Sequence, residues 1–151
     1  MTNFDEYRDV FVVADTIDDV VHPVTYELIG QARRIAKELG QLVQVMLLGE
    51  NVQSEAEELV AHGADIVHVF ESPLLKYYTT DGYTKVLTDF FEDHKPNILL
   101  IGATNNGRDL APRMSGRMKN GVVADCTILT VDTEEGLVEW TRPVSYTHLT
   151  L

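Results

Sequence analysis

Two loops in the sequence carry polar side chains directly after apolar runs, and one of them also has glycines that allow a ligand to approach the backbone closely. Gly102-Ala-Thr-Asn-Asn-Gly-Arg108 follows one apolar run, and Ala14-Asp-Thr-Ile-Asp-Asp19 follows another. A helix that begins within the first loop would present free N–H groups beside a guanidinium, which suits an anion such as a phosphate. Five residues are therefore our candidates for nucleotide binding or for an interface: Thr104, Asn105, Asn106, Gly107 and Arg108.

Each loop also has a simpler interpretation. Asn105 or Asn106 could serve only to cap the helix that follows. Asp15, Asp18 and Asp19 could bind a cation or orient a ligand hydroxyl, but carboxylates in such a loop more often face solvent. A plain strand-to-helix connection therefore stays open as the alternative to a binding site.

No combination of residues predicts catalysis or metal binding. The sequence has no Gly-x-Gly-x-x-Gly after its first apolar run and no P-loop motif, so the usual dinucleotide and phosphate-loop patterns are missing. Ser115 falls inside a helical segment instead of a strand-to-helix elbow, and a single cysteine argues against zinc. The histidines lack the paired spacing of metal ligands: His22, His62, His68, His94 and His148. We predict no catalytic residue and no metal site, and thus a segment that is not an enzyme.

Short β-branched runs alternate with segments of helical period, which predicts a parallel sheet with helices on both faces. Ser54 with Glu57 resembles a capping box for one short helix. A turn at Glu134-Glu-Gly136 can add an antiparallel edge strand. The expected strands cover 10–14, 42–48, 66–70, 97–102, 126–131 and 137–140, and the expected helices cover 23–39, 54–60, 86–91 and 108–119. We predict an α/β fold, one three-layer α/β/α domain with a mostly parallel, doubly wound sheet.

The composition limits the kinds of partner that this protein can bind. The 151 residues are 44% hydrophobic and 24% charged, as in a globular domain, and the net charge is −12. That charge disfavours nucleic acid and anionic membrane surfaces, because a polyanion would be repelled. No apolar run approaches the roughly 20 residues that span a bilayer, and the acidic N-terminus does not resemble a secretory signal. We therefore expect a cytoplasmic protein without membrane insertion, in which Cys126 is a buried, inert thiol.

The last eight residues differ in composition from the rest of the chain. Val144-Ser-Tyr-Thr-His-Leu-Thr-Leu151 contains no charged residue, and it matches the translation of a sequencing-library transposon adapter in one reading frame. We expect residues 144–151 to be a non-native tail and the domain to occupy residues 1–143. The alternative is an ordinary edge strand.

Several segments together resemble the alpha subunit of electron-transfer flavoproteins. The most specific are Pro96-Asn-Ile-Leu-Leu-Ile-Gly-Ala-Thr-Asn-Asn-Gly-Arg-Asp-Leu-Ala-Pro-Arg113 and Gly121-Val-Val-Ala-Asp-Cys-Thr127. Residues 12–15, 23–33 and 45–49 also fit, and Trp140-Thr-Arg-Pro143 resembles the approach to a Gly-Gly-Asn segment of the family. The resemblance covers residues 8–143 and identifies the chain with the N-terminal domain, whose fold is of the adenine-nucleotide-hydrolase type.

The resemblance implies one subunit of an alpha–beta heterodimer that carries FAD. Such proteins collect electrons from acyl-CoA dehydrogenases of fatty acid β-oxidation, or from NADH with bifurcation, and pass them on. In the family a C-terminal domain holds most of the FAD, and that domain is absent from these 151 residues. We therefore expect this segment to supply scaffold and beta-subunit interface, and to bind no cofactor by itself.

Two rival hypotheses stay open. The first is a stand-alone adenine-nucleotide-binding module of the universal-stress type, which would use the loops after the first and fourth strands. The second is a structural interaction domain without any ligand. Titration with AMP or ATP distinguishes the first rival from an electron-carrier subunit.

Overall fold

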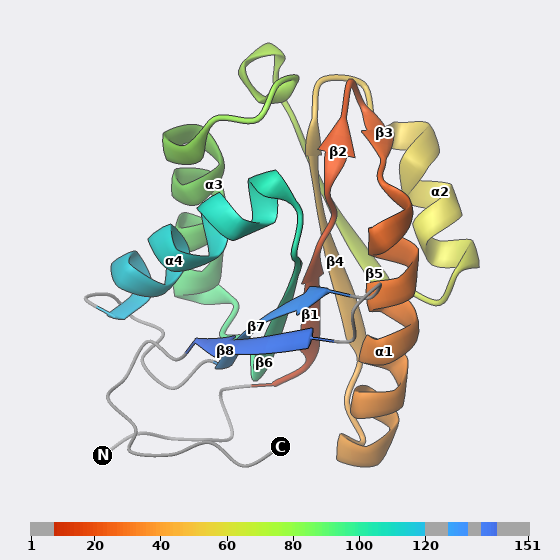
Figure 1. Cartoon of the computed structure of the whole chain (residues 1–151). Coiled ribbons are helices and arrows are strands. Elements are labelled where there is room, and N and C mark those ends of the chain that lie inside the picture. Colours follow the sequence, from red (N-terminus) through yellow and green to blue (C-terminus); the bar gives the residue numbers. More distant parts are fainter. Residues whose placement is uncertain (1–7, 120–126, 133–136, 142–151) are drawn as a thin grey trace.

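The computed structural model describes residues 8–119, 127–132 and 137–141, with side chains described for residues 8–118. Six strands form one sheet in the order β5-β4-β1-β6-β7-β8 (Figure 1). All neighbours pair in parallel except β7 and β8, which are antiparallel. The predicted mostly parallel sheet with an antiparallel edge is confirmed. The strands are β1 (Val10–Val13), β4 (Val43–Gly49), β5 (Ile66–Glu71), β6 (Ile98–Gly102), β7 (Thr127–Asp132) and β8 (Leu137–Thr141).

Helices cover both faces of the sheet, so the three-layer prediction is also confirmed. α1 and α2 lie against one face, and α3 and α4 lie against the other (Figure 1). A short 3-10 helix, η2, precedes α3. The helices are α1 (Pro23–Leu39), α2 (Gln53–Ala61), η2 (Pro73–Leu75), α3 (Thr80–Asp93) and α4 (Asn105–Lys119).

The central strand β1 divides the core into two parts. Its side chains alternate between the sheet faces, because successive residues of a strand point to opposite sides. Phe11 and Val13 pack with the core under α3 and α4, while Val10 and Val12 pack with the core under α1 and α2. All four side chains are buried. Burial on both faces explains why this strand is continuously apolar.

A small hairpin follows β1 where the sequence indicated only a polar loop. β2 (Thr16–Ile17) and β3 (Val20–Val21) pair in antiparallel fashion. Asp18 and Asp19 form its two-residue turn with φ of 51° and 64°. The tight turns that suit a hairpin require positive φ, and aspartate tolerates this better than most residues.

Three predicted helix starts were wrong. α3 begins at Thr80 and not at 86, and the Thr79 hydroxyl caps it by accepting a hydrogen bond from the Gly82 N–H. α4 begins at Asn105 and not at 108, three residues earlier than expected. α2 begins at Gln53, so Ser54 lies inside the helix and does not cap it. Instead the Glu71 carboxylate, at the end of β5, accepts a hydrogen bond of 2.9 Å from the Val52 N–H. Cys126 and residues 144–151 lie outside the described residues.

Candidate functional site

The strand order reverses between β1 and β6. From β1 the chain passes through α1 to β4 and β5, and then returns to β6 on the opposite side of β1. The two neighbours are in register, with Val13 opposite Ile101. In open α/β sheets, ligands bind beyond the carboxyl ends of the strands at such a point. The two loops that the sequence singled out, after β1 and after β6, therefore begin side by side.

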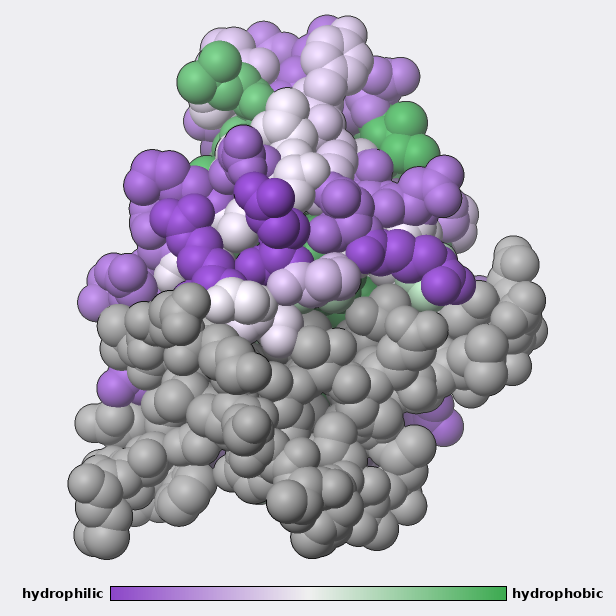
Figure 2. All heavy atoms as spheres, turned by 60° about the vertical axis from the view of Figure 1, so that its left-hand side comes forward, coloured by the Kyte–Doolittle hydropathy of each residue, from purple (hydrophilic) through white to green (hydrophobic). Residues whose placement is uncertain are grey.

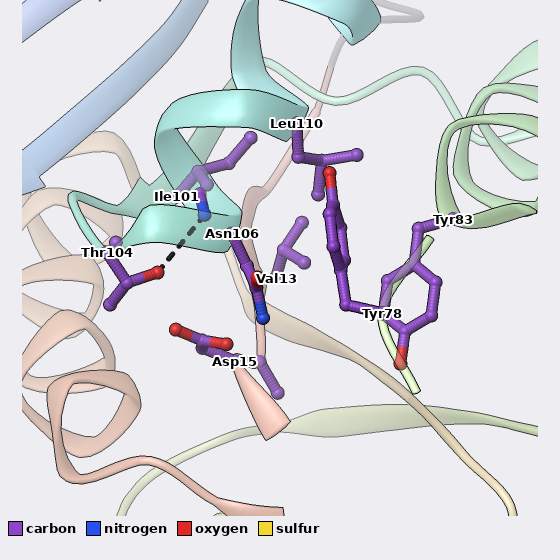
Figure 3. Close-up of a pocket in the computed structure, with 11 residues that line it drawn as sticks. Val13, Asp15, Tyr78, Tyr83, Ile101, Thr104, Asn106 and Leu110 are labelled. Carbon is purple, nitrogen blue, oxygen red and sulfur yellow. Dashed lines mark hydrogen bonds between the residues drawn. The ribbon is translucent and has the colours of Figure 1, made fainter. Parts of the chain in front are cut away.

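A small cleft lies at this point, with a free volume of about 20 Å³, which is room for about one water molecule. Its apolar wall includes Val13, Ile101 and Leu110. The labelled side chains of Figure 3 show the Asp15 carboxylate and the Asn106 amide approaching each other across the mouth of the cleft. This volume is far below the roughly 300–1,000 Å³ of small-molecule sites.

Thr104 caps α4, which corrects the expectation that Asn105 or Asn106 would do so. Its hydroxyl accepts a 3.1 Å hydrogen bond from the Gly107 N–H, and its carbonyl accepts the first helical bond, 2.8 Å, from the Arg108 N–H. Both asparagines lie in the first turn of the helix. The capping interaction is the ordinary one for a hydroxyl residue at this position.

Gly107 allows the helix to start directly against the sheet. A Cβ atom at this position would lie 1.8 Å from the Gly102 carbonyl oxygen, so no larger residue fits without a backbone shift. Neither glycine has positive φ. Close approach is therefore the reason for glycine at position 107, and not conformational freedom.

The structure brings three of the five candidate residues into the cleft. Thr104, Asn106 and Gly107 line it, whereas Asn105 and Arg108 are exposed and do not. The Arg108 guanidinium turns back, and its Nε donates a 3.3 Å hydrogen bond to the Ala103 carbonyl. The described lining thus contains a carboxylate and no cationic side chain. This charge favours a neutral, hydroxyl-bearing ligand over a phosphate.

Tyr78 forms a wall of the cleft that sequence reasoning missed. It stands beside Leu110 in Figure 3 and comes from the loop between η2 and α3. Its hydroxyl donates a 2.7 Å hydrogen bond to the Asp109 carboxylate, which also accepts a hydrogen bond from the Thr80 hydroxyl. The Tyr83 ring packs edge-on against Tyr78 at 5.0 Å. In the sequence, the run Tyr77-Tyr-Thr-Thr80 was the feature that could have indicated an aromatic wall at this place.

These contacts move two pKa values in opposite directions. Burial, together with the hydrogen bond to Asp109, raises the pKa of the Tyr78 hydroxyl. The hydrogen bonds from Thr80 and then Tyr78 lower the pKa of the Asp109 carboxyl group. The tyrosine stays neutral and the aspartate stays ionised at neutral pH, so a charge-assisted hydrogen bond joins the loop to α4.

The histidines do not form a second site in the part of the chain that the structure describes. His68 lies on β5 and shares a 2.6 Å hydrogen bond with the Gln44 side chain. Its ring packs against Phe90 and faces His94 at 5.9 Å. Burial, with the nearby His94, lowers the pKa of His68. No group of three or more potential metal ligands occurs among the described residues, and no described helix is long and apolar enough to cross a membrane.

Comparison with known proteins gives a consistent result. The family model described as "Electron transfer flavoprotein domain" matches residues 10–148. The electron transfer flavoprotein subunit alpha of Megasphaera elsdenii is 46% identical over 138 residues, which is 91% of this chain and 41% of that protein. Subunit LctC of the lactate dehydrogenase (NAD(+),ferredoxin) of Acetobacterium woodii is 45% identical over 133 residues, 88% of this chain and 32% of that protein.

A third relative is the acryloyl-CoA reductase electron transfer subunit beta of Anaerotignum propionicum, 43% identical over 130 residues, 86% of this chain and 35% of that protein. The chain therefore spans about two fifths or less of the length of these relatives. Among solved structures, a universal stress protein from Archaeoglobus fulgidus in complex with dAMP shares the fold. The TM-score is 0.50 at 17% identity, over 80% of this chain and 97% of that one.

Proposed function

This chain belongs to the electron transfer flavoprotein family, and we propose that it is the N-terminal part of an alpha subunit. In that role it serves as scaffold and as an interface for the beta subunit, while FAD carries the electrons. The observation that carries the proposal is the family match over residues 10–148 together with 46% identity to an alpha subunit.

The chemistry of the described residues supports this division of labour. A flavin cofactor does the redox chemistry itself, and the protein contributes binding and electrostatics. The cleft at the strand switch point has the Asp15 carboxylate and no basic side chain to hold a pyrophosphate. We infer that FAD is held mainly by residues outside this cleft, and we expect the chain alone to bind none.

We propose the electron donor of the full-length protein only by its chemical class. The relatives include subunit LctC of a lactate dehydrogenase (NAD(+),ferredoxin) and an electron transfer subunit of an acryloyl-CoA reductase. An acyl-CoA dehydrogenase, as in fatty acid β-oxidation, or NADH is the proposed donor for the full-length protein. Electrons then pass through the FAD of the heterodimer, so the domain acts as part of an electron carrier and not as a catalyst.

Two measurements test this function. Light scattering after size-exclusion chromatography of the chain mixed with a purified beta subunit should give an alpha–beta complex. The visible absorption spectrum of the purified chain after incubation with excess FAD and desalting should show no flavin. A chain that elutes alone, or that retains flavin at one equivalent, contradicts the proposal.

As a second function we propose nucleoside binding at the cleft, which would have to widen around the ligand because its free volume is only about 20 Å³. The Tyr78 ring offers a stacking surface, and the Asp15 carboxylate and Asn106 amide offer hydrogen-bond partners for hydroxyl groups. The loop Thr104–Arg108 would supply the floor, with Thr104 and Gly107 lining the cleft. The universal stress protein of the same fold was solved with dAMP.

Calorimetry with adenosine and AMP tests the second function. The Asp15 carboxylate should repel a phosphate, so adenosine is expected to bind at least as tightly as AMP. Replacement of Asp15 by Asn should improve AMP binding more than adenosine binding. Heat changes indistinguishable from buffer for both ligands at millimolar concentration exclude this function and leave the first one standing.

A further inference from the structure

An open groove lies at the amino end of the sheet, away from the cleft. Its free volume is about 420 Å³, against about 20 Å³ at the cleft, and this is within the roughly 300–1,000 Å³ of ligand sites. The last turns of α1, the start of β4 and the residue before β5 form it, toward the lower end of Figure 1. We call it the amino-edge groove, and its lining includes Arg33, Arg34, Lys37, Gln41, Leu42 and Asp65.

The charge of this groove is opposite to that of the chain. Three cationic side chains and one carboxylate belong to its described lining, whereas the whole chain has a net charge of −12. Lys37 lies four positions after Arg33 and three after Arg34 on α1, so the cations are neighbours on the helix surface. A local excess of positive charge attracts a negatively charged ligand.

The cations of the groove are not used in ion pairs within the described part of the chain. On the side of α3 and α4, hydrophilic side chains also cover much of the described surface (Figure 2), but there Lys85 pairs with Asp89 at 2.9 Å. Arg33 is held in place, because its Nη1 donates a 2.9 Å hydrogen bond to the Gly63 carbonyl and its side chain packs on that glycine. The groove thus combines one anchored guanidinium with two exposed cations that a ligand can reach.

The groove suits carboxylates better than a phosphate group or a nucleotide. Phosphate sites usually offer free backbone N–H groups, but the N–H groups at positions 41–43 already donate to oxygen atoms of the protein at 2.8–3.0 Å. None of the described lining residues is aromatic, so no ring is present to stack on a base. Leu42 in the lining and Leu39 at the end of α1 are each 45% exposed. A ligand that carries apolar groups beside its carboxylates would therefore gain by covering them.

The same surface continues along α1. Arg34 also lines a second hollow of about 230 Å³, together with Gln31, Ile35 and Glu38. Arg34 therefore lies between two hollows that follow one helix. An extended polypeptide segment can occupy both, whereas a compact anion fills only one.

We propose that the amino-edge groove binds an acidic segment of a partner protein, whose aspartate or glutamate side chains meet Arg33, Arg34 and Lys37 and whose apolar side chains cover Leu42. The groove lies at the start of β4, and the cleft lies at the opposite, carboxyl end of the strands. A segment bound in the groove therefore leaves the cleft accessible. This inference goes beyond the proposed function and does not depend on it.

Fluorescence anisotropy of a short labelled peptide of glutamate and leucine, titrated with the purified full chain, tests the proposal. Arg34→Gln/Lys37→Gln should raise Kd by about threefold or more, as the loss of two exposed ion pairs does, while circular dichroism and thermal melting check the fold. The matched control, Lys85→Gln/Arg117→Gln, removes the same charge from α3 and α4. Its Kd should stay within about twofold of the wild type, because charges more than about 10 Å away are largely screened at 0.1 M salt.

Asp65 allows a test of opposite sign. Asp65→Asn removes the carboxylate from the described lining, and the amide oxygen can still accept the 2.8 Å hydrogen bond from the Val43 N–H. Kd for the peptide should therefore fall by about twofold, which a merely structural role of Asp65 would not produce.

Three results would each overturn the inference. They are no measurable binding of the peptide to the wild type, equal weakening in the groove variant and the control variant, and displacement of the peptide by an equal concentration of inorganic phosphate. The last result would make the groove a site for small anions. The complex with the beta subunit is measured separately, so failure here leaves the proposed function standing.

Discussion

The Tyr78 hydroxyl donates its hydrogen bond to Asp109, a residue 31 positions further along the chain. This bond ties the loop before α3 to the first turns of α4. It holds the Tyr78 ring against the cleft at the switch point, where it packs edge-on against Tyr83. The Tyr83 hydroxyl in turn donates a 2.7 Å hydrogen bond to the Leu75 carbonyl. Two tyrosines thus link the cleft wall to η2.

Replacement of Tyr78 by Phe keeps the ring and removes the hydrogen bond to Asp109. We expect the free energy of unfolding, measured by urea denaturation, to fall by about 1 kcal/mol. The neighbouring Tyr77 is 65% exposed, so Tyr77→Phe is the matched control and should leave stability unchanged. Equal effects of the two substitutions would contradict the role given to Tyr78.

The stability that Asp109 contributes should depend on acid pH. Its pKa in the folded protein is lowered by Thr80 and Tyr78, so the folded state favours the ionised form. That contribution is present above the pKa of the unfolded chain, about 3.9 for aspartate, and is lost as the pH falls through the folded value. The difference in stability between the wild type and Asp109→Asn should therefore shrink below about pH 4. A difference that stays constant from pH 7 to pH 2 would refute this.

Tyr78 should show the opposite dependence at alkaline pH. Its pKa in the folded protein is raised by burial and by Asp109, so the folded state favours the neutral hydroxyl. This contribution is complete below the pKa of an ordinary tyrosine, about 10, and decreases as the pH rises above it. Thermal melting of the wild type and of Tyr78→Phe between pH 8 and pH 11 should show a steeper loss in the wild type. Parallel curves would argue against a hydroxyl held neutral.

Gly107→Ala should be strongly destabilising, because its Cβ would meet the Gly102 carbonyl oxygen. We expect a loss of about 1–3 kcal/mol or more, as for other substitutions that overfill a packed site. Gly30→Ala is the control: Gly30 lies inside α1 and a Cβ there meets no atom within 4 Å. That change should stabilise the helix by roughly 0.5–1 kcal/mol. Chemical denaturation of both variants gives the comparison.

Asp19→Ala should destabilise the protein more than Asp18→Ala. Both residues have positive φ, so the conformational cost of alanine is similar in the two variants. Only Asp19 accepts hydrogen bonds from Glu50 and Asn51. The difference in unfolding free energy, expected to be about 1–2 kcal/mol, therefore measures these bonds. Hydrogen exchange of the Glu50 amide should accelerate in Asp19→Ala and not in Asp18→Ala.

Much of the site's position was predictable from the sequence. The apolar runs ending near Val13 and Gly102 predicted two strands, and the polar loops behind them predicted a crevice, because ligand sites in this fold class lie beyond the strand ends. The prediction that this crevice binds an anion did not follow from the fold class, because it depended on where one side chain points. Its cation, Arg108, lies outside the cleft lining, while the Asp15 carboxylate lies within it.

The sequence by itself determined the order and type of the elements and the family, because period, β-branching and the motif around residues 96–113 are local properties. Only the tertiary structure decided which distant residues meet. The Glu71 carboxylate, and not Ser54, accepts the hydrogen bond from the Val52 N–H at the start of α2. The Tyr78 hydroxyl donates to Asp109, and the hairpin contacts the turn after β4. Such contacts follow from the strand order that places β6 beside β1 and β4 on its other side, and no local pattern encodes that order.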